Sequence, residues 1–212
     1  LVLIGHSMGG LHAKMMVVDS GSSIWFSIAQ VPFEQIRARP ATLELVQRTT
    51  FFRAQPFVSR VVFIATPHRG SILASLGIGR LASLVVREPE AITAVHDEIV
   101  EMNPGGFRPE YARKVPTTID LLEPESLTLK ALDQLRPACW VATHTILGDI
   151  HASLLGGRDD CVVKVESGHT SNALSEICVP AKHTRVHHHP SAKQEVKRIL
   201  AEHLAEYDAA SR

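Results

Sequence analysis

The sequence contains little of what would place it in several common protein classes. It has only three cysteines in 212 residues: Cys139, Cys161 and Cys178. Their odd number and wide spacing predict buried thiols rather than a disulfide framework or a zinc cluster, although a single disulfide stays open. Basic and acidic residues both number 22, so the net charge is zero when histidine is neutral. This balance argues against nucleic acid as the main partner.

The sequence also lacks a long hydrophobic run and an initial methionine. No uninterrupted apolar stretch is long enough to cross a bilayer. The chain begins at Leu1, inside an apolar run that reads as a core strand. A central strand of a parallel sheet needs neighbours on both sides, so we expect the C-terminal part of a longer domain whose N-terminal strands are missing. Any targeting segment would lie upstream, which leaves a cytoplasmic or cell-envelope location open.

The first ten residues carry the strongest motif. Leu1–Ile4 predict a buried strand, and Gly5–Gly9 spell G-x-S-x-G before a plausible helix from Met8 onward. A serine on such a tight strand-to-helix turn is strained and needs neighbours without bulk, which explains the glycines. The turn would expose the Ser7 hydroxyl, and the N–H of Met8 would be one donor to an oxyanion.

Alternating strand and helix patterns follow along the chain. They predict a mostly parallel sheet flanked by helices, an α/β fold within one domain over residues 1–212. The expected strands after the first are 60–65, 140–147 and 176–180. The expected helices after the first are 41–52, 71–86, 90–102, 126–135 (with a cap at Ser126) and one that begins at Pro190.

Residues 85–136 form a long excursion between two predicted strands. Such excursions usually carry substrate selection, so we expect a helical, cap-like insertion there. Residues 24–52 fit either a mobile cap or an ordinary helical connection. Membrane-surface binding by residues 24–33 is conceivable, but core packing explains their scattered apolar residues as well.

A serine needs a base to become a nucleophile, and the base needs an orienting carboxylate. In a doubly wound hydrolase these residues follow one another along the chain in the order serine, acid, histidine. The chain offers Ser7, Asp160 and His183 in that order. Asp149, directly after the third strand, is a rival acid, and Asp159 fits a capping or solvating role better.

The chain holds twelve histidines, and most fit other roles than the base. His183 follows the last strand directly, where the base belongs. His6 belongs to the serine turn, while His68 and Arg69 follow the second strand and could line the site. The remaining candidates that we set aside are His12, His144, His169 and the run His187, His188 and His189. Three adjacent histidines in an extended segment do not converge on one ion, so we predict no metal site there.

On these residues the chain resembles a bacterial serine esterase/lipase group of the α/β-hydrolase superfamily. The matching segments are 5–10, 61–71, Asp160 before Val162-Val163, 175–176 and 195–200. The resemblance implies Ser7 as nucleophile, Asp160 as acid and His183 as base, with no cofactor. It also implies upstream strands and a loop with a second oxyanion donor. The chain departs from the family at Cys161, where glycine is usual, and at Lys164.

The leading hypothesis is therefore hydrolysis of small-molecule or lipid esters through an acyl-enzyme. The same three residues would also serve acyl transfer to an alcohol or amide cleavage. A non-catalytic binding module with a hydrolase fold is a further alternative. We expect the 212-residue chain by itself to be inactive or weakly active, because it lacks the second oxyanion donor. Its oligomeric state stays open.

Overall fold

Four parallel strands form one sheet in the order β1-β2-β3-β4. The computed structural model describes residues 1–71, 90–150 and 157–210. The strands are β1 (Val2–His6), β2 (Arg60–Ile64), β3 (Ala142–Gly148) and β4 (Ser175–Val179). Because all four strands run the same way, their carboxyl ends meet at one edge of the sheet. The α/β class predicted from the sequence is confirmed, with strand bounds shifted by one or two residues.

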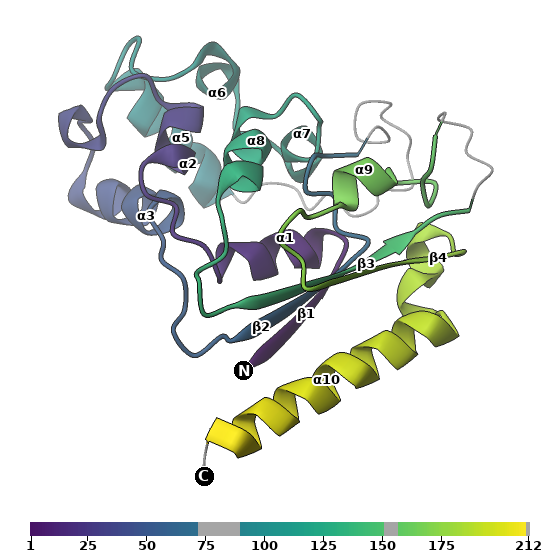
Figure 1. Ribbon diagram of the computed structural model, residues 1–212. Helices are drawn as coiled ribbons and strands as arrows, with labels where there is room; N and C mark the ends of the chain where they lie inside the picture. Colours follow the sequence, from purple (N-terminus) through teal and green to yellow (C-terminus); the bar gives the residue numbers. More distant parts are fainter. Residues whose placement is uncertain (72–89, 151–156, 211–212) are drawn as a thin grey trace.

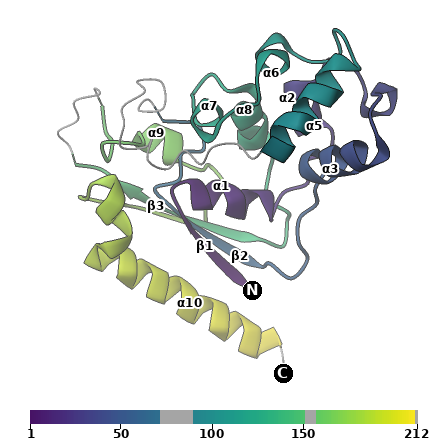
Figure 2. The same cartoon turned by 180° about the vertical axis from the view of Figure 1, so that it is seen from behind.

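Helices cover both faces of this sheet. Helix α1 (Met8–Met15) packs on one face, and the long helix α10 (Pro190–Ala210) runs across the other (Figures 1 and 2). Side chains along β2 alternate accordingly: Val61 and Phe63 join the core under α1, whereas Val62 and Ile64 join the core toward α10. The strand is buried on both faces, which explains its continuous apolar sequence.

Shorter helices form a layer above α1 (Figure 1). Trp25, Val46, Ile99 and Phe107 build a separate apolar cluster in this layer. The Trp25 Nε1–H donates to the carbonyl of Val31 at 2.7 Å. The short elements along the described chain are α2 (Ser23–Ile28), η1 (Phe33–Gln35), α3 (Pro40–Thr50), α5 (Glu90–Glu101), α6 (Pro109–Arg113), α7 (Thr118–Leu121), α8 (Leu127–Gln134), α9 (Val165–Gly168) and η3 (His183–His188). Of these, η3 lies outside the layer, because its Val186 packs in the core toward α10.

The helical layer combines two stretches that lie far apart in the sequence. Residues 23–50 and 90–134 pack together, and α2 lies against α8. The expected cap at Ser126 is present, because its hydroxyl accepts a hydrogen bond from the Leu129 N–H. The helix expected over 71–86 and the first residues of the cap-like range 85–136 lie outside the described residues.

The prediction of buried thiols is wrong. All three cysteines are free thiols; Cys139 and Cys178 are exposed, and Cys161 is only partly buried. Cys139 lies in the loop before β3, and Cys178 lies on β4, the last strand in the order of the described sheet. None of the helices that the structure describes combines the length and apolar character that a membrane span requires.

Candidate functional site

Ser7 occupies a strained turn between β1 and α1. Its φ of 55° lies in the left-handed region, and its N–H donates to the Ile64 carbonyl at 2.8 Å. A Cβ on Gly5 would lie 2.6 Å from the backbone of Gly10, and one on Gly10 would lie 2.7 Å from Cγ2 of Thr66. Close packing of the turn therefore demands glycine at these two positions.

The motif predicts that Gly5 and Gly9 are both needed to avoid steric clashes in the turn, and this expectation does not hold for Gly9. A Cβ at Gly9 would meet nothing within 4 Å. The steric reason therefore applies to Gly5 and to Gly10, the residue after the motif.

Ser7, His183 and Asp160 form a continuous line of hydrogen bonds. The Ser7 hydroxyl lies 2.8 Å from Nε2 of His183, and Nδ1 of His183 lies 2.8 Å from Oδ2 of Asp160. With Asp160 ionised, Nδ1 carries the proton and Nε2 is free to accept one from the serine. This arrangement holds the imidazole in the tautomer that a general base needs.

The backbone holds Asp160 in place. Its second oxygen, Oδ1, accepts hydrogen bonds from the N–H groups of Val162 at 2.9 Å and Val163 at 2.7 Å. Its carbonyl accepts from the N–H of His183 at 2.8 Å, so the acid and base loops are joined twice. The side chain is only 1% exposed, and these contacts satisfy a buried carboxylate that would otherwise be costly.

The two other acidic candidates have different partners. Asp149 is buried and its carboxylate pairs with the Arg158 guanidinium at 2.5 Å. Asp159 accepts a hydrogen bond from the N–H of Cys161 at 2.8 Å. Of the three carboxylates considered from sequence, Asp160 is the one at hydrogen-bonding distance from His183 in the described structure.

Cys161 adopts a left-handed conformation directly after Asp160. Its φ is 78°, a region that glycine enters readily and that residues with a Cβ enter at a cost. This is the position at which the resembled family usually has glycine. Glycine at this position would adopt the same backbone conformation without that cost.

His6, in the turn that holds Ser7, contacts His183. Its Nε2 lies 3.0 Å from the carbonyl oxygen of His183, to which it donates, and the two rings are 5.0 Å apart. A second ring, that of His187, lies 4.5 Å from His6. Burial is the main cause that lowers the pKa of His6; the hydrogen bond to the His183 carbonyl acts against it, and the neighbouring His183 and His187 add to the lowering. The net effect favours the neutral form of His6 beside His183.

Met8 begins α1, the helix that follows Ser7. The first N–H groups of an α-helix have no intrahelical acceptor, and they carry the positive end of the helix dipole. The Met8 N–H is thus chemically suited to stabilise an oxyanion formed at Ser7.

The other histidines considered from sequence have other partners, apart from the contact of His187 with His6. His144, on β3, contacts Arg60 and Ser175, and His169 contacts the Glu176 carboxylate at 2.9 Å. The ring of His187 packs on that of His188 at 4.1 Å, and His12 is exposed on α1. Across the described ranges no group of three or more His, Cys, Asp or Glu side chains is arranged to hold a metal ion.

His68 and Arg69, expected as possible site-lining residues, line a separate small pocket. Its wall also contains Lys14, a buried lysine on α1, and Asp133, which lies at the end of α8. Sequence reasoning missed Lys14. A signal was available, because a single lysine stands within the apolar stretch 11–18 of the first helix.

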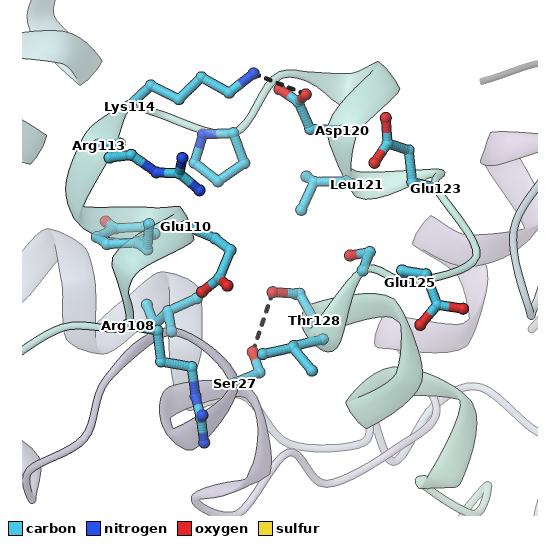
Figure 3. Close-up of a pocket in the computed structure, with 15 residues that line it drawn as sticks. Ser27, Arg108, Glu110, Arg113, Lys114, Asp120, Leu121, Glu123, Glu125 and Thr128 are labelled. Carbon is cyan, nitrogen blue, oxygen red and sulfur yellow. Dashed lines mark hydrogen bonds and ion pairs between the residues drawn. The ribbon is translucent and has the colours of Figure 1, made fainter. Parts of the chain in front are cut away.

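A larger cavity of about 580 Å³ lies in the helical layer, between α2, α6, α7 and α8. Figure 3 shows Arg108, Arg113 and Lys114 on one side of it and Glu123 and Glu125 on the other. The Lys114 ammonium reaches across to Asp120 at 2.8 Å. Apolar side chains such as Ile28 and Leu127 also line it, so this cavity combines apolar surface with charges of both signs.

The chain is similar in fold to solved bacterial lipases. Staphylococcus hyicus lipase matches with a TM-score of 0.53 at 15% identity, over 99% of this chain and 70% of that one. The mature lipase BlEst2 of Bacillus licheniformis matches with a TM-score of 0.45 at 14% identity, over 88% of this chain and 59% of that one. No protein-family model and no curated protein sequence matches the chain.

The match to the Staphylococcus hyicus lipase shows a lipase-like α/β-hydrolase fold. At this level of identity the likeness concerns fold and not activity. The chain spans 59% of the length of the mature Bacillus licheniformis lipase.

Proposed function

We propose that the chain supplies the nucleophile, base and acid of a serine hydrolase that cleaves carboxylic esters. The observation that carries the proposal is the unbroken hydrogen-bond line from Ser7 through His183 to Asp160, with 2.8 Å at each contact. The resemblance to bacterial serine esterases and lipases supports the same assignment, and the lipase-like fold agrees with it.

The proposed reaction has two halves. Ser7 Oγ attacks the ester carbonyl while His183 Nε2 takes its proton, and the Met8 N–H donates to the oxyanion. Collapse of the tetrahedral intermediate expels the alcohol, which leaves with the proton from His183. A water molecule then attacks the acyl-enzyme, with His183 again as base, and releases the carboxylic acid and free Ser7.

The proposal extends to the helical layer as a cap that contacts the acyl or alcohol part of the substrate. The cap-like insertion is 85–136, and the cavity of Figure 3 supports ligand contact there because several of its lining residues are apolar. Substrates are accordingly proposed to be small-molecule or lipid esters.

Hydrolysis of p-nitrophenyl esters tests the proposal, in the chain extended upstream through the strands that the resemblance implies. Ser7→Ala should remove turnover, and the matched variant Ser191→Ala, at an exposed position of α10, should retain it. Full activity in Ser7→Ala would contradict the mechanism. Product analysis with a competing alcohol would reveal acyl transfer instead of hydrolysis.

A further inference from the structure

The small pocket beside α1 has a volume of about 150 Å³ and lies apart from Ser7, Asp160 and His183, none of which lines it. It is bounded by α1, by the segment that follows α8 and by the loop that follows α9. The side chains that matter for its chemistry are Lys14, His68, Arg69, Asp133 and Arg136.

His68 in the wall of this pocket has no polar partner. Its side chain is fully buried, and neither ring nitrogen has a hydrogen-bond partner in the described structure. The edge-to-face contact with Phe63, at 4.7 Å between ring centroids, holds the ring. A buried donor or acceptor without a partner is unfavourable and rare, so the two nitrogens point to a ligand or ordered water that completes them.

Positive charge in the pocket exceeds negative charge. Lys14 is 5% exposed, and its Nζ donates to the Asp133 carbonyl at 3.0 Å and lies 3.8 Å from its carboxylate. The same carboxylate accepts from Nε of Arg69 at 3.0 Å. One carboxylate therefore serves two cations, and Arg136 adds a third at the exposed side of the pocket.

The pKa values of Lys14 and His68 are consistent with binding of an anion. Burial lowers the pKa of Lys14 to about 8, although Asp133 acts in the opposite direction. Burial, with the charges of Lys14 and Arg69, lowers the pKa of His68 to about 3, so His68 is neutral near pH 7 and carries one N–H donor. A buried ammonium whose charge is not balanced would gain from a second negative partner.

We propose that this pocket binds a small oxyanion, such as phosphate or a short carboxylate, which accepts hydrogen bonds from Lys14 Nζ and from the ring N–H of His68. The volume of about 150 Å³ holds several waters, which suits a phosphate-sized ion and is small for a nucleotide. Hydrogen bonds from charged donors to an anion are the strong class, and the low-dielectric wall strengthens them.

Titration of the full chain with inorganic phosphate at pH 7, at constant ionic strength, tests this proposal. The ring nitrogens of His68, followed by NMR with labelled histidine, should shift in a saturable way, and calorimetry should give the same affinity. Lys14→Met and His68→Phe should each weaken binding at least about tenfold, as expected for one lost hydrogen bond in a charged network.

Lys197→Met is the matched control, because Lys197 is exposed on α10, across the sheet from the pocket. It should leave phosphate binding unchanged. Because Lys14→Met removes a buried ion pair and can impair folding, Arg136→Gln at an exposed position serves as the second variant, and it should weaken binding severalfold.

Two results would overturn the proposal. One is the absence of saturable binding of both phosphate and acetate by the folded, unmodified chain. The other is binding that Lys197→Met weakens as much as Arg136→Gln and that leaves the His68 resonances unmoved, which would mean non-specific attraction to surface charge. The test requires no esterase activity, so its outcome is separate from that of the proposed function.

Discussion

Two buried histidines that follow strands of the same sheet have opposite surroundings. His183, after β4, has a partner at each ring nitrogen: Ser7 at Nε2 and Asp160 at Nδ1. His68, after β2, has none at either nitrogen and packs on Phe63 near two cations. Both positions read alike in the sequence, as a histidine just beyond a strand. The difference shows that distant segments of the chain supply the partners that decide which histidine can act as a base. Here that segment is the loop that contains Asp160.

The largest expected effect comes from His183. Replacement by Gln should lower kcat for ester hydrolysis by about 10⁴-fold or more, because the serine loses its base. His169→Gln, at an exposed histidine that contacts Glu176, should change kcat little. Steady-state kinetics on both variants measures the two values of kcat. If kcat fell equally in both, His183 would have no special role as a base compared with His169.

The acid is tested by a matched pair of substitutions. Asp160→Asn should lower kcat by about 10⁴-fold, because the amide no longer holds the tautomer of His183 that accepts the serine proton. Asp149→Asn should retain most of the activity and instead lower stability, since it weakens the ion pair of this buried carboxylate with the exposed Arg158. If Asp149→Asn lowered kcat more than Asp160→Asn, the acid would be Asp149 and not Asp160.

The pH dependence of stability distinguishes His68. Its pKa is about 3 in the folded chain against an ordinary value of 6.5. The unfolded chain therefore binds the extra proton first, so the stability linked to neutral His68 is complete above pH 6.5 and is lost as the pH falls toward 3. Relative to His68→Phe, the unmodified chain should lose about 2 kcal/mol of unfolding free energy between pH 7 and pH 5.

Urea unfolding without phosphate, at both pH values, measures this difference. His12→Phe, at an exposed histidine of α1, is the control and should follow the unmodified chain. Parallel pH profiles for His68→Phe and the unmodified chain would show that burial of His68 does not suppress its protonation.

His6 should have a moderate effect through its contact with the carbonyl of His183. His6→Ala removes that hydrogen bond, worth about 1 kcal/mol, and should lower kcat about fivefold with KM unchanged. His6→Gln keeps a donor and should recover part of the loss. If KM rises while kcat stays constant, His6 contacts substrate and does not position the base.

The smallest effect is expected at Cys161, whose φ of 78° suits glycine. Cys161→Gly should raise the unfolding free energy by up to about 1 kcal/mol, because relief of strain exceeds the added entropy of the unfolded chain. Cys161→Ala keeps the strain and should bring no such gain. Thermal unfolding of both variants, with activity as a check, makes the comparison; equal stability would mean that the acid loop is not strained.

Much of the fold could be predicted from local pattern alone. The β-branched run at 61–64 and the G-x-S-x-G motif each depend on neighbouring residues, and both lie where expected. What could not be predicted depends on long-range packing. The sequence around His68 says that a strand ends there, but not that α1 brings a buried Lys14 beside it. Nor does any pattern at His6 reveal a contact with residue 183.

The residues of the candidate site could be predicted only in part. The order serine, acid, histidine along the chain offered Asp160 and also allowed Asp149, because both follow β3 and precede β4. The contacts of Asp149 and Asp160 are distinguished only by the backbone path of the loop that contains Asp160. In this loop the Asp160 carboxylate accepts hydrogen bonds from two backbone N–H groups. The family's usual glycine at position 161 was a hint of that course, since the backbone there has a positive φ.

Labelling with a fluorophosphonate probe tests the central claim most directly, because the probe reacts only with a serine activated by its neighbours. The chain extended upstream should be labelled at Ser7, the label should vanish in Ser7→Ala, and His183→Gln should slow it strongly. Absence of labelling in the folded, extended protein, or labelling that persists in Ser7→Ala, would contradict the account.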